Sequence, residues 1–347
     1  MKKFLLLFTF IYIVLHAGAQ FKTIGEGTEF EEPETGFAKI LQMKNGNTMF
    51  FQISVKEGID LRIYDANHKQ KITKHIDPKY GKLKDGNIDG IFEINGDATL
   101  LVSETDEKRP VLNRLVIDGS TGALKKDEKI AELMKYNLGQ GYAMVFGNVP
   151  PPDFYVRKDP NSDNYAVAML NSFESDRNKR IEIIFYGSDH QETGRAFYSS
   201  PDNKYKYMKY IDMAVIGKEK VSVLAYAYNT ASSGGKESEL VLANLDAGST
   251  TVTLSELNFS KDLTIEGGIA RYNPVTKKII LLASVKLQKK NQYAALIAYV
   301  DPFSRKMENA FPVFPEQAND KSVEVFGRKN EFTGMPQNLL IMTEVFQ

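Results

Sequence analysis

The chain contains no cysteine and no tryptophan among its 347 residues. Without cysteine, the protein has no disulfide, no thiol nucleophile and no cysteine-ligated metal, so its stability comes from apolar burial and hydrogen-bonded backbone. The lack of tryptophan removes a side chain on which many sugar-binding sites stack their ligand, although 17 Tyr and 21 Phe remain. These two absences make a cysteine-dependent enzyme impossible and make a carbohydrate enzyme less expected.

An excess of charge of either sign is also missing. The whole chain has a formal net charge of zero, and removing Lys2 and Lys3 with an N-terminal leader leaves −2. Nucleic-acid binding and docking on an anionic membrane both depend on clustered basic charge, so neither is expected. A hydrophobic content of 42% is normal for a globular chain with a sizeable core.

The first 19 residues have the composition of a secretory signal peptide. Lys2 and Lys3 precede the apolar run Phe4–Leu15, and Ala17-Gly18-Ala19 fits a small-x-small cleavage site. The run is shorter than the roughly 20 apolar residues that span a bilayer, which disfavours the alternative of a retained membrane anchor. We therefore expect an exported protein, periplasmic, at the cell surface or secreted, with no integral membrane contact after signal cleavage.

Three segments are predicted: a signal peptide over residues 1–19, a polar lead-in over 20–36 and a single domain over 37–347. Within the domain, β-branched and aromatic runs are bounded by Gly, Pro, Asn and Asp, which is typical of strands and turns. The best helical periodicity covers Asp127–Tyr136, where Ile130, Leu133 and Met134 are spaced as on one helix face. Residues 139–160, rich in Gly and Pro, are predicted to form a long ordered loop.

Apolar strands recur along the domain with a mean spacing of 58 residues. Their centres are Phe51, Leu101, Met169, Leu224, Leu282 and Ile341. A second strand follows each of the first five and ends in a polar turn, usually at an aspartate; these turns include Asp65, Asp118, Asp189, Asp246 and Asp301. Such a repeat predicts one supersecondary unit per period.

The repeat predicts an all-β, β-propeller-like fold of about six blades, each with four short antiparallel strands. We expect the second strand of each blade to be buried and the third to be amphipathic, because neighbouring blades cover the inner strands on both faces. Tandem β-sandwiches are the alternative. The last blade looks incomplete, because the chain stops at Gln347 directly after the apolar segment Leu339–Phe346, and either a truncated reading frame or an open ring would explain it.

The sequence contains few motifs of metal-binding or catalytic sites. The three histidines after the leader, His68, His75 and His190, form no zinc pattern, and His68 and His190 are expected in solvated turns. Asp85-Gly-Asn-Ile-Asp-Gly90 opens like a calcium loop, but its twelfth position is Gly96 instead of glutamate, so a turn before a strand is the better interpretation. No nucleophile elbow and no phosphate-binding loop occurs, and no catalytic residue, metal or cofactor is predicted.

Two stretches are candidates for binding because loops on a rigid sheet scaffold often hold binding sites. The first, Asp153–Asn164, combines aromatic, cationic and turn-forming residues and supplies the predicted binding residues Phe154, Tyr155 and Arg157. The second is the charged segment Ser172–Arg180. The alternative is that Phe154 and Tyr155 pack in the core while the charges form a solvated rim.

The signal peptide, the lack of cysteine and the Asp-x-x-Thr-Gly turn at Asp118–Gly122 resemble those of exported β-propeller-like proteins of Bacteroidota-type bacteria. The resemblance is one of architecture and implies no site residues; the Trp-based signatures of named propeller families are missing. The leading hypothesis is a non-enzymatic protein that binds a macromolecule, a protein or a glycan, through propeller loops. The alternative is an enzyme that processes glycans or small molecules with carboxylates at the propeller axis.

Overall fold

The computed structural model describes ten ranges of the chain: residues 36–54, 57–79, 86–107, 109–135, 137–147, 149–198, 204–229, 238–257, 263–287 and 292–313. The predicted signal peptide, nearly all of the lead-in and the sixth apolar strand around Ile341 lie outside these ranges. Among the described residues, no helix combines the length and the apolar content that crossing a bilayer requires.

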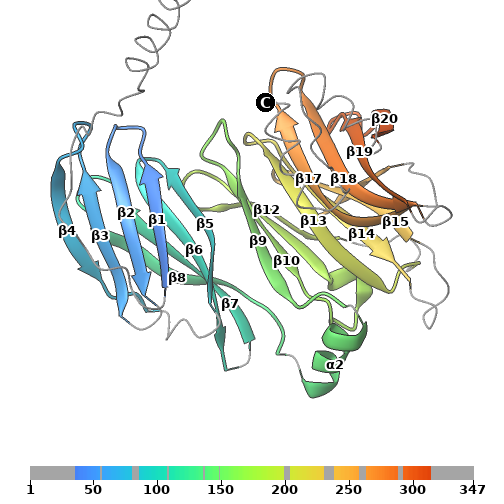
Figure 1. The fold of residues 1–347 in the computed structure, drawn as a ribbon, viewed down its shortest axis with the longest axis horizontal. Coiled ribbons are helices and arrows are strands. Elements are labelled where there is room, and N and C mark those ends of the chain that lie inside the picture. Colours follow the sequence, from blue (N-terminus) through green and yellow to red (C-terminus); the bar gives the residue numbers. More distant parts are fainter. Residues whose placement is uncertain are drawn as a thin grey trace, which may run out of the picture.

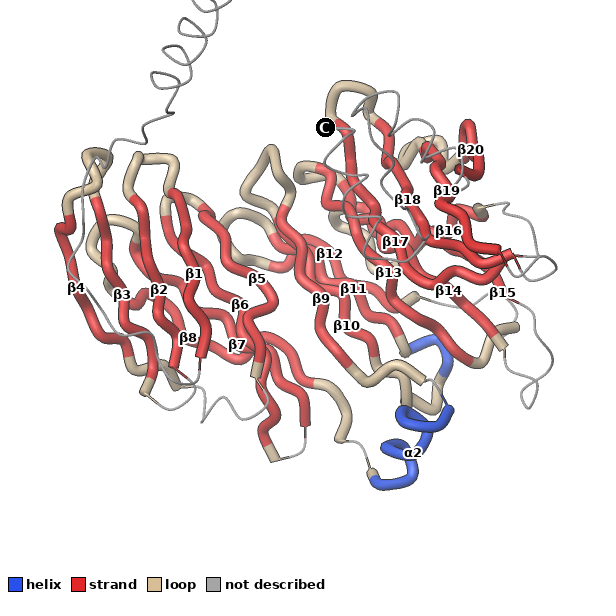
Figure 2. The backbone as a smooth tube through the Cα atoms, in the orientation of Figure 1, coloured by secondary structure: helices blue, strands red, loops and turns tan. Residues whose placement is uncertain are grey.

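The described residues form five four-stranded antiparallel sheets, each a simple meander of consecutive strands. We call them blades 1 to 5 in chain order, from β1–β4 to β17–β20. Figure 1 shows the blades following one another across the molecule, from blue to orange-red. Figure 2 shows that strands make up almost all of the regular structure, with α2 (Leu138–Gly147) at one end of the molecule.

The first, inner strands of the blades are β1 (Gly36–Gln42), β5 (Asn87–Ile94), β9 (Asp153–Lys158), β13 (Tyr207–Ile216) and β17 (Leu263–Asn273). The second strands are β2 (Thr48–Ser54), β6 (Asp97–Asp106), β10 (Tyr165–Leu170), β14 (Lys220–Tyr228) and β18 (Lys278–Leu287). The third strands are β3 (Gly58–Tyr64), β7 (Arg109–Asp118), β11 (Ile181–Tyr186), β15 (Ser238–Asp246) and β19 (Gln292–Val300). The fourth, outer strands are β4 (Gln70–Ile76), β8 (Leu124–Glu132), β12 (Glu192–Phe197), β16 (Thr253–Glu256) and β20 (Met307–Val313).

The inner strands line up around a common axis. β1 contacts β5, β5 contacts β9, β9 contacts β13 and β13 contacts β17. Four apolar clusters fill the spaces between successive blades, so each interface has its own core. Faces of sheets packed in this radial order are the defining feature of a propeller, and the predicted all-β, propeller-like fold is confirmed.

The turns between third and fourth strands repeat one local structure. Asp118 Oδ1 accepts hydrogen bonds from the backbone N–H groups of Ser120 and Thr121, at 3.0 and 2.7 Å. Asp301 accepts equivalent bonds in blade 5, and Asp65 in blade 1 accepts from the N–H groups two and four residues ahead. An aspartate that bonds the backbone two or three residues ahead closes a turn locally, which explains why this residue type recurs there in the sequence.

Side chains and backbone at the blade ends also join neighbouring blades. Asn95, in the turn after β5, donates through Nδ2 to the carbonyl oxygen of Ser188 in blade 3 at 2.8 Å. Lys220, at the start of β14, donates through Nζ to the carbonyl oxygen of Pro302 in blade 5 at 2.7 Å. These bonds fix the rotation of each blade against the next one.

Two expectations from the sequence are wrong in detail. Asp127–Glu132 belongs to the outer strand β8, because its backbone pairs with β7, and the helix lies further along, inside the stretch predicted to be a loop. The third strands β7 and β11 are almost completely buried instead of amphipathic. The local pattern could not reveal that β8 finds its pairing partner in the third strand of its own blade. It also could not reveal that neighbouring blades cover both faces of the third strands.

Candidate functional site

Charged and aromatic side chains meet where the inner strands of blades 3, 4 and 5 lie together. We call Tyr155, Arg157, Tyr210, Asp212 and Arg271 the inner-strand cluster. Arg157 and Tyr155 come from β9, Tyr210 and Asp212 from β13, and Arg271 from β17. The cluster is notable because the interfaces on either side of β13 are filled mainly by aliphatic side chains.

Asp212 is the centre of the inner-strand cluster. Its side chain is only 5% exposed, and each carboxylate oxygen accepts from a different blade. Oδ1 accepts from Nη2 of Arg157 at 2.5 Å; Oδ2 accepts from Nη1 of Arg271 and from the backbone N–H of Ala270, the latter at 2.9 Å. A buried carboxylate is stable only when paired and hydrogen-bonded, and these contacts meet that condition.

A β-bulge gives Asp212 this position. The pairing between β13 and β14 shifts register between Tyr210 and Asp212, so Ile211 has no partner across the strand pair. Such a shift increases the local twist of the strand and changes the direction in which the next side chain points. Tyr210 therefore packs toward blade 3 while Ile211 packs toward blade 5, and Asp212 reaches arginines on both sides.

The two arginines have donors that Asp212 does not use. Their side chains are 39% and 53% exposed, and among the described residues Arg157 makes a hydrogen bond to Asp212 alone. The Nε of Arg157 is buried and has no hydrogen-bond partner among the residues that the structure describes. Two guanidinium groups around one carboxylate leave one net positive charge, held in place by the buried anion.

Tyr155 and Tyr210 add a stacked aromatic pair to the inner-strand cluster. Their ring centroids are 3.7 Å apart at an interplanar angle of 11°. Burial raises the pKa of both hydroxyls above the usual range of tyrosine, and for Tyr210 the charge of Asp212 raises it further. Both hydroxyls therefore stay protonated at neutral pH and remain able to donate a hydrogen bond.

A second group of carboxyls lies on the inner strands β5 and β9. Asp89 is the extra residue of a bulge between Ile88 and Gly90 in β5, and burial raises its pKa to about 6. Asp153, at the start of β9, contributes to this rise through its charge, and burial raises the pKa of Asp153 as well. A carboxyl whose pKa is raised to about 6, as for Asp89, can transfer a proton near neutral pH.

The predicted binding residues do not all lie on one face. Tyr155 and Arg157 belong to the inner-strand cluster, whereas Phe154 is 3% exposed and packs on the opposite face of β9, in the core between blades 2 and 3. Alternation along a strand separates Phe154 from its two neighbours. Ligand binding by Tyr155 and Arg157 stays a prediction. The predicted segment Ser172–Arg180 forms a turn with a short 3-10 helix, Arg177–Lys179.

Sequence reasoning missed Tyr210, Asp212 and Arg271. A signal for two of them was present, because Asp212 and Arg271 are charged residues with apolar or aromatic neighbours on both sides in their strands. Charged residues in such positions are rarely buried unless they are paired. The sequence could have indicated that each needs a partner, but not that they share one.

The histidines have no common site. His68 is exposed in a turn, as expected, whereas His190 is 8% exposed and contacts the hydroxyl of Tyr165 through Nδ1 at 3.1 Å, so its predicted solvation is wrong. Burial and the nearby Arg114 lower the pKa of His190 to about 4. Within the described ranges, no three His, Asp or Glu side chains are grouped so that they could hold a metal ion.

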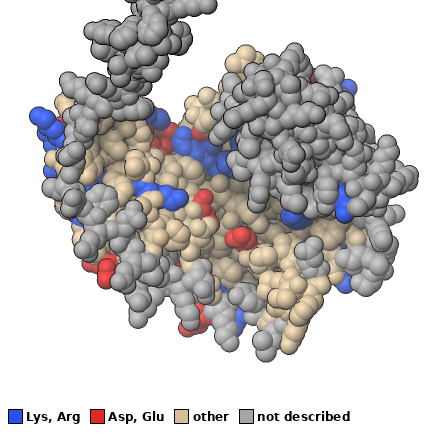
Figure 3. Space-filling model, in the orientation of Figure 1, with Lys and Arg blue, Asp and Glu red and all other residues tan. Residues whose placement is uncertain are grey.

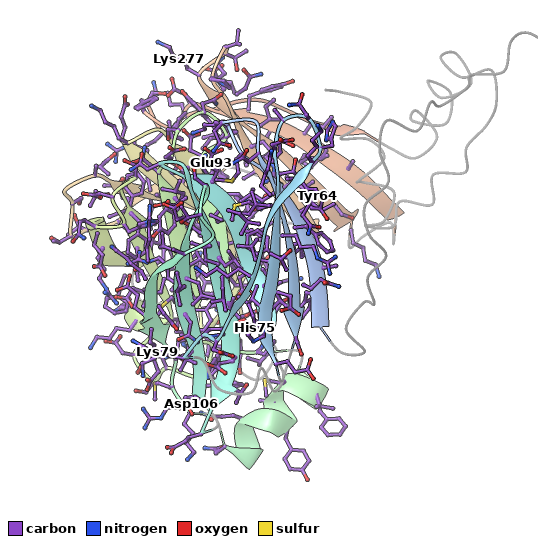
Figure 4. The ribbon with its side chains drawn as sticks, turned by 90° about the vertical axis from the view of Figure 1, so that its left-hand side faces the viewer. Tyr64, His75, Lys79, Glu93, Asp106 and Lys277 are labelled. Atoms are coloured by element: carbon purple, nitrogen blue, oxygen red, sulfur yellow. The ribbon has the colours of Figure 1, made fainter. Side chains whose placement is uncertain are left out.

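Polar contacts also join the inner hairpin turns at one end of the molecule. Figure 4 shows Glu93 and Lys277 toward this end, and His75 and Asp106 toward the other. Glu93 accepts a hydrogen bond from the backbone N–H of Lys44 at 2.6 Å, and Lys44 forms an ion pair with Asp163 at 2.7 Å. The turns of blades 1, 2 and 3 are thereby held together.

Figure 3 shows a hollow in the middle of the face seen in Figure 1, with acidic and basic side chains along it. The hollow lies between the blades drawn at the left and those drawn at the right, where the inner strands meet in Figure 1. This face therefore exposes charges of both signs near the axis.

No protein-family model and no curated protein matches the chain. Among solved structures, an alpha-L-arabinanase of Cellvibrio cellulosa is 11% identical, with 82% of this chain and 96% of the other covered and a TM-score of 0.29. An ulvan lyase of a polysaccharide lyase family is 9% identical, with 84% and 73% covered and a TM-score of 0.43. A lectin from Burkholderia pseudomallei is 9% identical, with 82% and 71% covered and a TM-score of 0.43. Likenesses at such low identities and TM-scores do not establish the function of this chain.

Proposed function

We propose that this protein is an exported binding protein that holds a glycan at the inner strands of blades 3 to 5. The single observation that carries the proposal is the inner-strand cluster, in which a buried carboxylate orients two half-exposed guanidinium groups beside two stacked tyrosines. Polar groups that are fixed in place, together with aromatic surface, give a site the orientation and contact area that recognition of a polyhydroxylated ligand needs.

Several features favour a protein that binds its ligand without catalysing a reaction. The chain has no cysteine, no nucleophile elbow and no zinc pattern. In the described residues the charged groups of the inner-strand cluster are engaged with one another, which suits a rigid recognition surface. The N-terminal leader is the reason for proposing export. We expect that N-terminal sequencing of the exported protein will find Gln20 as its first residue.

The proposal is tested by screening the chain from Gln20 onward against soluble oligosaccharides and peptides by thermal shift, followed by calorimetric titration. A ligand of the native state raises the melting temperature by mass action, so at least one glycan should raise it by several degrees. Tyr155→Phe, which removes a single hydroxyl at the inner-strand cluster, should weaken this binding several-fold. The matched control Tyr142→Phe, on the exposed surface of α2, should leave it unchanged.

A screen in which no glycan raises the melting temperature, or in which both tyrosine variants bind like the wild type, would contradict the proposal. A peptide that binds in place of the glycans would favour a protein partner instead.

A second candidate is an enzyme that acts on glycans through carboxyls at the axis, and Asp89 favours it. Its pKa of about 6 would let it donate a proton near neutral pH, with Asp153 on the neighbouring inner strand as the second carboxyl. Release of new reducing ends from a bound glycan, lost in Asp89→Asn, would establish this candidate; unchanged glycan after prolonged incubation would favour binding alone.

A further inference from the structure

We propose that Arg157 and Arg271 bind an anionic group of the ligand, a carboxylate or a sulfate ester. This inference rests on the proposed function, because it names the class of glycan that the inner-strand cluster would take: an acidic one. It concerns a positioned pair of arginines and not a general excess of basic charge, since the chain as a whole is close to neutral.

The first argument is the balance of charge within the cluster. Asp212 is the only carboxylate that either arginine pairs with in the described residues, and it contacts both. The charge of one guanidinium group therefore remains uncompensated at a partly buried position, where an added anion is attracted more strongly than in bulk water.

The second argument is that both arginines have N–H donors that they do not use for Asp212. Each guanidinium group has five N–H donors arranged in a planar fork, which matches the oxygens of a carboxylate or sulfate group. Arg157 uses Nη2 for Asp212, and Arg271 uses Nη1 for Asp212 and for the carbonyl oxygen of Ala270. The remaining N–H groups include Nε of Arg157, which is buried and has no partner within the described ranges.

The third argument is preorganisation. Asp212 is itself fixed by the backbone N–H of Ala270 and by the bulge in β13, so the two arginines lose little further freedom when a ligand binds. The hydroxyl of Tyr210 lies close enough to Arg157, Asp212 and Arg271 for their charges to affect its pKa, and it stays protonated. It could donate a further hydrogen bond to the same anionic group.

The test uses the chain from Gln20 onward and measures binding of dextran, carboxymethyl-dextran, dextran sulfate and sodium sulfate by titration at low ionic strength. The three dextrans share one backbone and differ in their charged group, while sodium sulfate supplies the anion without a sugar. We expect at least one of the three anionic probes to bind at least tenfold more tightly than neutral dextran. Arg157→Gln and Arg271→Gln should each weaken that binding about tenfold, the loss expected when a hydrogen bond to a charged group is removed.

Arg195→Gln is the matched control. Arg195 lies on the outer strand β12 with a similar side-chain exposure of 43% and pairs with Glu182 and Glu192, so its loss should not affect binding. Melting temperatures check that each variant is folded. If a glutamine variant does not fold, Arg157→Lys and Arg271→Lys retain the charge but lose the planar fork, and they should weaken binding by a smaller factor.

The outcomes separate this inference from the proposed function. Neutral dextran or other neutral glycans binding as tightly as the anionic probes, with no effect of Arg157→Gln or Arg271→Gln, would overturn the anion site and leave glycan binding intact. Sulfate binding that depends on both arginines, without binding of any glycan, would support the anion site and overturn glycan binding. Failure of all three anionic probes to bind would overturn the inference.

Discussion

Burial raises the pKa of the carboxyl groups of Asp89 and Asp153 on the inner strands β5 and β9, and for Asp89 it raises the pKa to about 6. The neighbouring side chains Asn87 and Ser103 partly offset the loss of solvation through hydrogen bonds. Asp212, in contrast, is buried between two arginines, and these provide the opposite charges that a buried carboxylate needs. The same residue type thus has two roles on the inner strands β5 and β13, set by its partners.

The raised pKa of Asp89 predicts a destabilising effect of its charge. In the unfolded chain the carboxyl ionises near pH 3.8, whereas in the fold it ionises near pH 6, so the stability of the fold falls as the pH rises through this window. Above pH 6 the full cost is present, about 2–3 kcal/mol for a shift of roughly two units. Asp89→Asn should therefore raise the free energy of unfolding at pH 8 and should leave it nearly unchanged at pH 3.5.

Urea unfolding of both proteins at the two pH values measures this difference. Asp106→Asn, on an exposed aspartate at the end of β6, serves as the control and should show no such dependence on pH. An equal effect of Asp89→Asn at both pH values would show that packing, and not charge, is responsible.

At the scale of elements, α2 is the one connection between blades that forms a regular helix within the described residues. Asn137 and Gln140 hydrogen-bond reciprocally to each other's backbone N–H groups, at 3.0 and 2.7 Å, and so cap its first turn. The helix presents Val145 and Phe146 to solvent, 75% and 79% exposed, while Val149 just after it is 7% exposed. The connection is therefore buried near its two ends, at Leu133 and Val149, and exposes apolar side chains from the helix between them.

The different exposures of Val145 and Val149 predict that replacing each valine with serine changes the free energy of unfolding by different amounts. Val149→Ser should lower the free energy of unfolding by about 1–2 kcal/mol, because a buried methyl contact is lost and a hydroxyl is buried. Val145→Ser should change it by less than about 0.5 kcal/mol, because an exposed side chain contributes little to stability. Chemical denaturation measures both values, and a comparable loss for Val145→Ser would show that α2 packs against another part of the protein.

The element that sequence analysis assigned wrongly is also explained at this scale. Ile130, Leu133 and Met134 have helical spacing, but the backbone of residues 124–132 finds its hydrogen-bond partners on β7. A short apolar pattern is compatible with helix and strand alike, and the available pairing edge decides between them.

At the scale of the whole molecule, the blades are joined by polar contacts as well as by apolar cores. Arg114 in blade 2 has a side chain that is 6% exposed; it pairs with Glu128 and donates to the hydroxyl of Tyr165 and the carbonyl oxygen of His190 in blade 3. The ring of Tyr165 stacks on Tyr186 at 4.9 Å. This network ties the outer part of blade 2 to blade 3, as Asp212 ties blades 3, 4 and 5 near the axis.

Arg114→Leu should lower the free energy of unfolding by about 3 kcal/mol, because the buried hydroxyl of Tyr165 and the carbonyl oxygen of His190 lose their donor and Glu128 loses its ion pair. The pKa of His190 should rise toward its ordinary value, since the charge of Arg114 is one of the causes that lower it. Urea unfolding and NMR titration of the His190 ring measure the two effects.

Arg109→Leu is the control on the same strand. Arg109 is 52% exposed and pairs with Glu132 within blade 2, so neither the stability nor the pKa of His190 should change appreciably. If the pKa of His190 stayed near 4 in Arg114→Leu, burial alone would account for it.

The amino-acid sequence by itself determined the repeat, most of the strands and the turns. Apolar strands every 58 residues on average and an aspartate after the third strand of a unit are local signals, because a strand and its turn are encoded within about ten adjacent residues. The expected fold class follows from repeating such a unit.

The inner-strand cluster was decided only by the tertiary structure. Arg157, Asp212 and Arg271 are separated by more than 50 residues along the chain and meet because three blades present their inner strands to one axis. A one-residue bulge in β13 then lets Asp212 reach both arginines. No local pattern carries this information, because the distance between residues of different repeats depends on how the blades pack.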